Sequence, residues 1–157
     1  MRALVLSDSH GDKSALKLIA SRFSAVDYFF HLGDYVGDAH ALSAQVPQSK
    51  VVCVKGNCDI SAAEPEFEEL VLQGNRVILT HGHALHAKYS YDRLLYYAAE
   101  RDAAAILFGH THLAHTEYVN GIWLVNPGSA SRKGNNLPSV ALLVITPSGV
   151  VPKVIKL

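Results

Sequence analysis

The sequence is poor in cysteine, with Cys53 and Cys58 as its only two among 157 residues. Two thiols so close together do not make a disulfide framework, and the lack of a thiolate quartet argues against a structural zinc knuckle. The sequence also lacks long apolar runs, because the longest are strand-sized and too short to span a bilayer. Asp8 interrupts the N-terminal apolar run before a signal-peptide core could form. We therefore expect a cytoplasmic protein with no membrane partner.

Net charge is absent as well, since lysine plus arginine and aspartate plus glutamate both total 14. This balance gives no global field that would favour long nucleic acids, so we expect no clear nucleic-acid surface. Histidine, in contrast, is abundant, with nine residues crowded into a few short stretches. These stretches decide the functional interpretation.

Hydrophobic residues make up 49% of the sequence, which suits one compact domain spanning residues 1–157. Apolar and β-branched runs predict strands at Ala3–Leu6, Asp27–His31, Val51–Val54, Glu69–Leu72, Arg76–Leu79, Ala105–Phe108, Thr116–Val119, Trp123–Val125, Val140–Ile145 and Val151–Ile155. Helical spacing predicts helices at Lys13–Arg22, at about Ala39–Gln45 and at Tyr91–Arg101. Alternating strands and helices favour parallel pairing, whereas turn signals at Gly74-Asn75 and Asn120-Gly121 add antiparallel hairpins. The pattern predicts an α/β sandwich with a pair of mixed sheets.

Polar clusters follow five of the predicted strands. They are SDSH with Asp8 and His10, HLGDYVGD with Asp34, KGNCD with Asn57, THGH with His81 and His83, and GHTH with His110 and His112. In an open α/β sheet, the carboxyl ends of parallel strands are where binding sites assemble. Five clusters at five such ends therefore indicate one functional site.

The residue types in these clusters are those of a metal centre, because Asp and Asn offer oxygen ligands and neutral His offers nitrogen. Three pairs of candidates are spaced two residues apart: Asp8/His10, His81/His83 and His110/His112. In extended backbone, this spacing directs both side chains of a pair to one side. Glycine permits sharp turns beside the candidates, at Gly33, Gly56, Gly82 and Gly109. A mixed set of about seven ligands is more than one ion takes, so we infer a dinuclear site.

The remaining histidines lack this context. We expect His31, late in an aromatic strand, to be a satisfied core residue or to lie just behind the site. Three others are predicted to be ordinary surface or loop residues: His40, His86 and His115. The role of His83 stays open: it could contact the substrate, lie behind the site or be a loop residue. The NPGS stretch, residues 126–129, is first of all a turn, but its place after the Trp123–Val125 strand suggests a loop near the site.

The five blocks DSH, GD, GNCD, HGH and GHTH resemble the signature motifs of the calcineurin-like metallophosphoesterases. The resemblance runs from Asp8 to Ser129, and the GNCD form is similar to that of their small bacterial and archaeal phosphodiesterase branch. It implies a four-layer α/β/β/α sandwich with mixed β-sheets and a dinuclear metal centre at the strand ends. It also implies the ligands of each ion: Asp8, His10 and His112 for one, Asn57, His81 and His110 for the other, and Asp34 bridging the two.

The resemblance further implies a phosphoester hydrolase in which a hydroxide that bridges two divalent ions attacks phosphorus in line. Manganese is typical of the family, although the ligand types equally admit Fe, Ni or Zn. We expect Asn57, Asp34 and His83 to take part in catalysis beside the ions. The expected partner is a small phosphoester substrate, and relatives often form homo-oligomers.

One departure from the family concerns the acid that protonates the leaving group. The wider superfamily has His where this chain has Cys58, and an Asp that orients this His where this chain has Gly37. Asp38 lies one residue after the position of the family's Asp. The missing acid would favour small or activated phosphodiesters, since general acid catalysis is typically worth about 10²–10⁴-fold. His83 is the candidate substitute.

Three other functions stay open. A phosphomonoesterase or nucleotidase would need cations to clamp the dianion, for which Arg132 and Lys133 are the nearest candidates. A scaffold, like the retromer subunit with a similar fold, would be expected to have lost ligands, and none of the seven is lost. A thiol hydrolase built on Cys58 lacks a clear helix N-terminus after the cysteine, which would lower the pKa of the thiol.

The tyrosines of residues 89–97 are predicted to pack over the sheet, with substrate stacking as the alternative.

Overall fold

The computed structural model describes residues 1–132 and 137–157. One sheet has the strand order β10-β9-β1-β2-β3, with β1 at Arg2–Leu6, β2 at Tyr28–His31, β3 at Lys50–Cys53, β9 at Ser139–Thr146 and β10 at Gly149–Lys156. The other has the order β4-β5-β6-β8-β7, with β4 at Phe67–Leu72, β5 at Asn75–Thr80, β6 at Ala105–Leu107, β7 at His115–Val119 and β8 at Ile122–Asn126. The helices are α1 (Lys13–Arg22), α2 (Val36–Gln45) and α3 (Asp92–Ala99).

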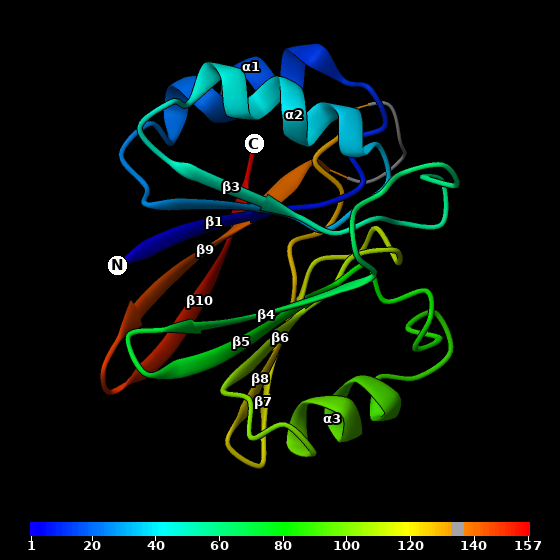
Figure 1. The fold of residues 1–157 in the computed structure, drawn as a ribbon, viewed down its shortest axis with the longest axis vertical. Helices are drawn as coiled ribbons and strands as arrows, with labels where there is room; N and C mark the ends of the chain where they lie inside the picture. The colour runs from blue at the N-terminus through cyan, green and yellow to red at the C-terminus, as the bar shows by residue number, and fades with distance from the viewer. Residues whose placement is uncertain (133–136) are drawn as a thin grey trace.

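These elements form four layers, because α1 and α2 cover the outer face of the first sheet and α3 covers the outer face of the second (Figure 1). Both sheets are mixed. In the first, β1, β2 and β3 run parallel and β9 and β10 antiparallel to their neighbours. In the second, β5, β6 and β8 run parallel, and β4 and β7 pair antiparallel at the two edges. The predicted four-layer sandwich is confirmed.

The alternation of apolar side chains along each strand explains the layering. In β1, Ala3 and Val5 point into the core between the sheets, whereas Leu4 and Leu6 pack against the helices. In β5, Val77 and Leu79 enter the core between the sheets. Strands that are apolar on both faces need cover on both sides, which the opposite sheet and the helices provide.

Two predicted boundaries are wrong for identifiable reasons. Helix α2 begins at Val36 rather than at Ala39, because Asp59 in a distant loop accepts hydrogen bonds from the Tyr35 and Val36 N–H groups at 2.9 Å. The cap therefore comes from outside the segment, where local sequence cannot show it. The β4–β5 turn is centred on Gln73-Gly74 rather than Gly74-Asn75, with φ of 50° and 81°, and Asn75 already belongs to β5.

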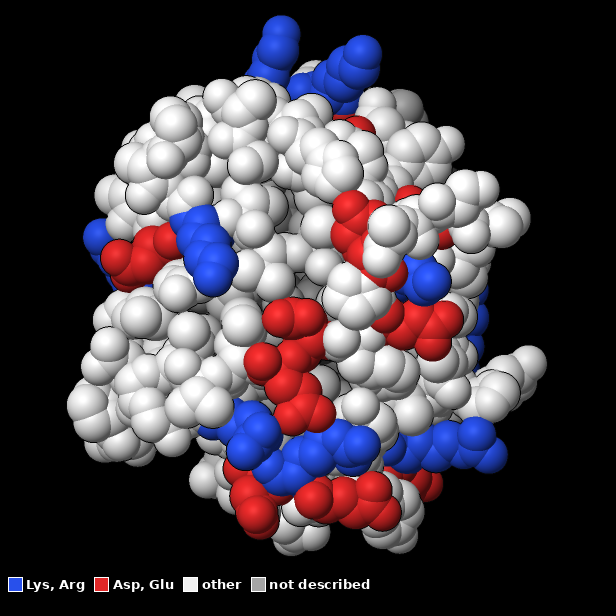
Figure 2. Space-filling model, viewed as in Figure 1, with Lys and Arg blue, Asp and Glu red and all other residues white. Residues whose placement is uncertain are grey.

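None of the helices in the described residues is long and apolar enough to cross a membrane. On the face shown in Figure 2, basic and acidic side chains lie next to one another. Arg76 and Arg101 both contact Glu69 at 3.0 Å, so part of the positive charge is paired.

Candidate metal centre

The candidate ligands lie on loops that follow the parallel strands of both sheets. Asp8, Asp34 and Asn57 follow β1, β2 and β3, and His81 and His110 follow β5 and β6. The loops bond to each other through backbone groups: the Asp8 N–H donates to the Gly33 carbonyl, and the Gly109 N–H to the His81 carbonyl, both at 3.1 Å. The loops of the two sheets also bond to each other: the His110 N–H donates to Asp8 Oδ2 at 3.1 Å.

Four of the candidates form one compact group. One ligand atom of each of Asp8, His10, Asp34 and His112 lies within 4.8 Å of those of the other three. The Nε2 atom of His112 is 3.1 Å from Asp8 Oδ1 and 3.5 Å from His10 Nε2. Two carboxylates and two imidazoles at these separations can surround a single divalent ion.

The other candidates gather around His81. Its Nε2 atom is 3.2 Å from Asn57 Oδ1 and 3.4 Å from Asp34 Oδ1. The ring of His110 lies edge-on to that of His81, with centroids 5.0 Å apart. The other oxygen of Asp34, Oδ2, lies 4.0 Å from His10 Nε2. Asp34 thus stands between the two groups and presents one oxygen to each.

The fold fixes the position of one proton on His81. Its Nδ1 atom lies 2.7 Å from the Leu32 carbonyl oxygen, which can only accept, so Nδ1 carries the proton. The Nε2 atom faces the side-chain oxygens of Asp34 and Asn57. A backbone carbonyl that orients the imidazole in this way is a common feature behind metal-binding histidines.

The backbone of the site differs from our expectation. We expected extended backbone at the paired candidates, but both members of two pairs have left-handed φ: 54° and 46° at Asp8 and His10, and 67° and 59° at His110 and His112. The extended geometry is therefore wrong at these pairs. Non-glycine residues rarely adopt this region, and such residues concentrate at functional sites.

Two glycines are required by close approaches at the site. A Cβ atom on Gly56 would collide with the carboxylate of Asp34. A Cβ atom on Gly109 would collide with Ser7 Oγ and would lie 2.8 Å from Asp8 Oδ2. The carboxylates of Asp34 and Asp8 thus lie directly against the backbone of Gly56 and Gly109. This is consistent with the turns expected at these glycines.

The electrostatics of the site suit a cation. Asp8 is fully buried, and its Oδ1 atom accepts no hydrogen bond from the described residues. Burial alone would raise the pKa of Asp8, but the nearby imidazoles of His112 and His81 hold that pKa below its usual value. Reciprocally, Asp8 raises the pKa of His112. A buried carboxylate oxygen with imidazole nitrogens of His112 and His81 at 3.1 and 3.9 Å fits a divalent metal ion.

Several residues that hold these loops were not predicted as part of the site. The Asn126 amide donates to the Gly109 carbonyl at 2.9 Å and to Thr111 Oγ1 at 3.0 Å, which brackets His110. Ser129 Oγ donates to the Asp8 carbonyl at 2.9 Å. The NPGS turn therefore lies against the site, as suggested by its place after a strand. Asp38 accepts the Gly11 N–H at 2.8 Å and so holds the loop that follows His10.

Cys58 and His83 lie beside the ligands. The Cys58 N–H donates to Asp34 Oδ1 at 3.0 Å, while the thiol is exposed. Loss of hydration and the nearby carboxylates, Asp34 first, raise the pKa of Cys58 to about 11, which disfavours a thiolate nucleophile. The ring of His83 lies 5.4 Å from that of His81 and 6.1 Å from that of His110, between centroids. Burial, followed by the charge of His81, lowers the pKa of His83, so its imidazole is neutral at pH 7.

The other polar candidates have ordinary surroundings. His31 is fully buried and bonds to Ser9, as expected for a satisfied residue behind the site. The exposed residue Arg132 donates its backbone N–H to Asp12 Oδ2 at 2.9 Å. Lys133 lies outside the described residues. His115 belongs to β7 and contacts Glu117 at 3.2 Å.

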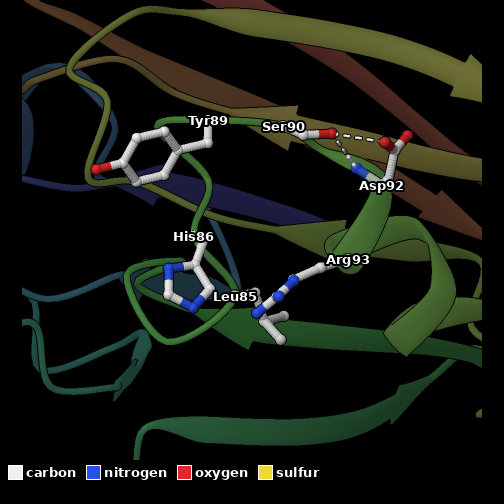
Figure 3. Close-up of a pocket in the computed structure, with 6 residues that line it drawn as sticks. All are labelled: Leu85, His86, Tyr89, Ser90, Asp92 and Arg93. Carbon is white, nitrogen blue, oxygen red and sulfur yellow. Dashed lines mark hydrogen bonds between the residues drawn. The ribbon is translucent and has the colours of Figure 1, made fainter.

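The segment after His83 surrounds two hollows. Figure 3 shows the first, of about 440 Å³, lined by Leu85, His86, Tyr89, Ser90, Asp92 and Arg93. The second, of about 560 Å³, is lined by Lys88 and Tyr89 and by Thr111 and Leu113, the neighbours of His112 in sequence. Tyr89 is 90% exposed, so its ring is available to a ligand in either hollow. The second hollow adjoins the loop that carries the candidate ligands His110 and His112.

Comparisons with known proteins agree with this geometry. A family model described as the calcineurin-like phosphoesterase superfamily domain matches residues 1–148. The probable metallophosphoesterase YsnB of Bacillus subtilis is 40% identical over 132 residues, covering 82% of this chain and 75% of YsnB. Phosphodiesterase YfcE of Escherichia coli is 29% identical over 167 residues, covering 91% of this chain and 87% of YfcE. Vps29 of Entamoeba histolytica, solved in complex with Zn²⁺, aligns with a TM-score of 0.79 at 24% identity over 99% of both chains, a likeness of fold alone.

Proposed function

Because this chain belongs to the calcineurin-like phosphoesterase superfamily, we propose that it is a phosphodiesterase that uses two divalent metal ions. The position of Asp34 carries the proposal, because its two oxygens face two different groups of ligands. The name of the relative YfcE, a phosphodiesterase, supports the same reaction class. Manganese is the proposed ion, with Fe, Ni and Zn as alternatives that the same ligand types admit.

Each group of ligands would hold one ion. We assign Asp8, His10 and His112 to the first ion and Asn57, His81 and His110 to the second, with Asp34 shared. When bound, such a pair of ions lowers the pKa of water to supply a nucleophile at neutral pH and offsets charge on the phosphoryl oxygens. The protein's own contribution is to fix the ligands, through the Leu32 carbonyl on His81 and the His110 N–H on Asp8.

The chain supplies little acid for the leaving group. Cys58, with a pKa of about 11, is a much weaker acid than an imidazolium. His83 is neutral at pH 7, because burial lowers its pKa, so it carries no surplus proton to donate. Diesters whose leaving group departs without protonation are therefore the proposed substrates.

The second hollow is a proposed seat for the organic part of the substrate. It combines the exposed ring of Tyr89, the apolar Leu113 and the charge of Lys88. After burial and His81, Lys88 is the next cause that lowers the pKa of His110, so its ammonium group acts on the charges of the site. An anionic substrate with an aromatic group matches these features.

The test is hydrolysis of bis(p-nitrophenyl) phosphate by chelator-treated protein with and without added Mn²⁺. We expect activity only with the ion, and faster than on p-nitrophenyl phosphate. Asp34→Asn and His110→Ala should lower it at least about a hundredfold, since even residues behind a metal site cost about 10–100-fold. His115→Ala is the matched control, because this half-buried strand residue lies outside the ligand groups.

Several outcomes would contradict the proposal. Activity that survives chelation, or that Asp34→Asn leaves intact, would remove the metal centre from the mechanism. Preference for the monoester would point to a phosphomonoesterase. No turnover on any phosphoester by metal-loaded protein would favour a scaffold.

A further inference from the structure

A second cluster of metal-binding side chains lies apart from the candidate metal centre. His40 comes from α2, Cys53 ends β3, and Glu64 lies in the connection from β3 to β4. One ligand atom of each side chain lies within 4.8 Å of those of the other two. We propose that these three residues bind one zinc ion.

The direction of the Cys53 side chain separates this cluster from the dinuclear centre. Along β3, Val52 and the following Val54 pack into the core between the sheets, whereas Val51 packs on the helix side. Cys53 is two residues beyond Val51 and so shares its face, which α2 covers. The thiol therefore faces α2 on the outside of the sheet, and the loops with the phosphoesterase ligands lie beyond the strand end.

The three donors are those that zinc prefers. Thiolate sulfur, imidazole nitrogen and carboxylate oxygen are all common zinc ligands, and three protein ligands leave a fourth position for water. His40 and Glu64 already face each other, with Nε2 2.8 Å from Oε1. The His40 side chain is 67% exposed, so an ion can reach the cluster from solvent.

Binding must displace a proton from the thiol. Burial, followed by the charges of Glu64 and Asp59, raises the pKa of Cys53 to about 11, so at neutral pH the group is a thiol. When Zn²⁺ binds, a zinc–sulfur bond forms and the thiol proton leaves to solvent, with no change of oxidation state.

The proposed ion would fasten both ends of the loop that carries Asn57. Cys53 directly precedes this loop and Glu64 ends it, and the Lys55 N–H bonds the Pro65 carbonyl at 2.9 Å. Through His40, the ion would also connect this loop to α2, whose first turn is capped by Asp59 from the same loop. The proposed effect on Asn57 rests on the proposed phosphodiesterase function. The binding of zinc to the three residues is independent of that function.

Cobalt(II) provides the test, because thiolate–cobalt bonds absorb in the near ultraviolet and the seven proposed phosphoesterase ligands contain no sulfur. Chelator-treated full-length protein is titrated with Co²⁺ alone. We expect a charge-transfer band whose final amplitude corresponds to one cobalt–thiolate bond per chain, which is absent in Cys53→Ser and retained in Cys58→Ser. Glu64→Gln and His40→Ala, which keep both thiols, should weaken the affinity read from this band at least about tenfold.

The controls separate this proposal from the phosphodiesterase proposal. Asp34→Asn should leave the band unchanged, whatever its effect on hydrolysis. Absence of a band in the wild type, or a band that persists in Cys53→Ser and disappears in Cys58→Ser, overturns the zinc site. Affinity unaffected by both Glu64→Gln and His40→Ala also overturns it.

Discussion

The buried His31 makes the stability of the protein depend on pH in a way that can be calculated. The Gly33 N–H donates to His31 Nδ1 at 3.3 Å, so the proton lies on Nε2, which donates to Ser9 Oγ at 2.9 Å. A second proton on Nδ1 would face the Gly33 N–H and would have to be buried. Burial accordingly lowers the pKa of His31 from 6.5 to about 4, although Asp38 and Asp8 oppose the shift.

The sign of the effect follows from the two pKa values. At pH 7 His31 is neutral in both the folded and the unfolded chain, so there is no penalty. As the pH falls below 6.5, His31 becomes protonated in the unfolded chain, whereas in the folded protein it stays neutral down to about pH 4. The free energy of unfolding therefore decreases between pH 6.5 and pH 4. The loss is about 2 kcal/mol at pH 5 and about 3 kcal/mol at pH 4.

Chemical denaturation of chelator-treated protein at pH 7 and pH 5 measures this loss. His31→Gln retains a side-chain donor for Ser9 but does not titrate, and the other histidines are common to both proteins. We expect the wild type to lose about 2 kcal/mol more than the variant between the two pH values. Equal losses would refute the assignment of His31 as a buried neutral imidazole.

Four further changes test the site. Gly56→Ala should cost about 1–3 kcal/mol by denaturation and lower metal affinity, because its Cβ meets the Asp34 carboxylate, whereas Gly37→Ala, with nothing within 4 Å, should be neutral or stabilising. Asp59→Ala should cost about 1 kcal/mol in the same assay through loss of the α2 cap, and no loss would contradict the cap. Cys58→His should keep Mn²⁺ binding and increase hydrolysis of diesters with poor leaving groups, and unchanged preference would remove the lost-acid explanation. Tyr89→Ala should raise KM for an aromatic diester, while Tyr96→Ala, also exposed but on α3, should not.

The sequence predicted most of the fold because its signals are local. Helix α1 begins and ends where helical spacing predicts, and its N-cap Asp12 lies next to it in sequence. The ten strands were found because apolar alternation reports which face is buried. At two wrong element starts, the cause was distant in sequence. The start of α2 depends on Asp59, and β4 begins at Phe67 rather than at Glu69 because Phe67 pairs with Thr80 of β5.

The candidate ligands and the residues that position them differ in how easily a sequence reveals them. A ligand must be one of a few residue types, so Asp8, His10 and His81 stand out once several such motifs follow successive strands. A positioning residue such as Asn126 acts on backbone carbonyls, which every residue has, so its own type does not reveal its target. The left-handed backbone at the ligands shows what those bonds maintain, since strained φ persists only where the surroundings enforce it. Loss of activity in an Asn126 variant would therefore not mark Asn126 as a ligand, and its metal affinity and stability must be measured with its turnover.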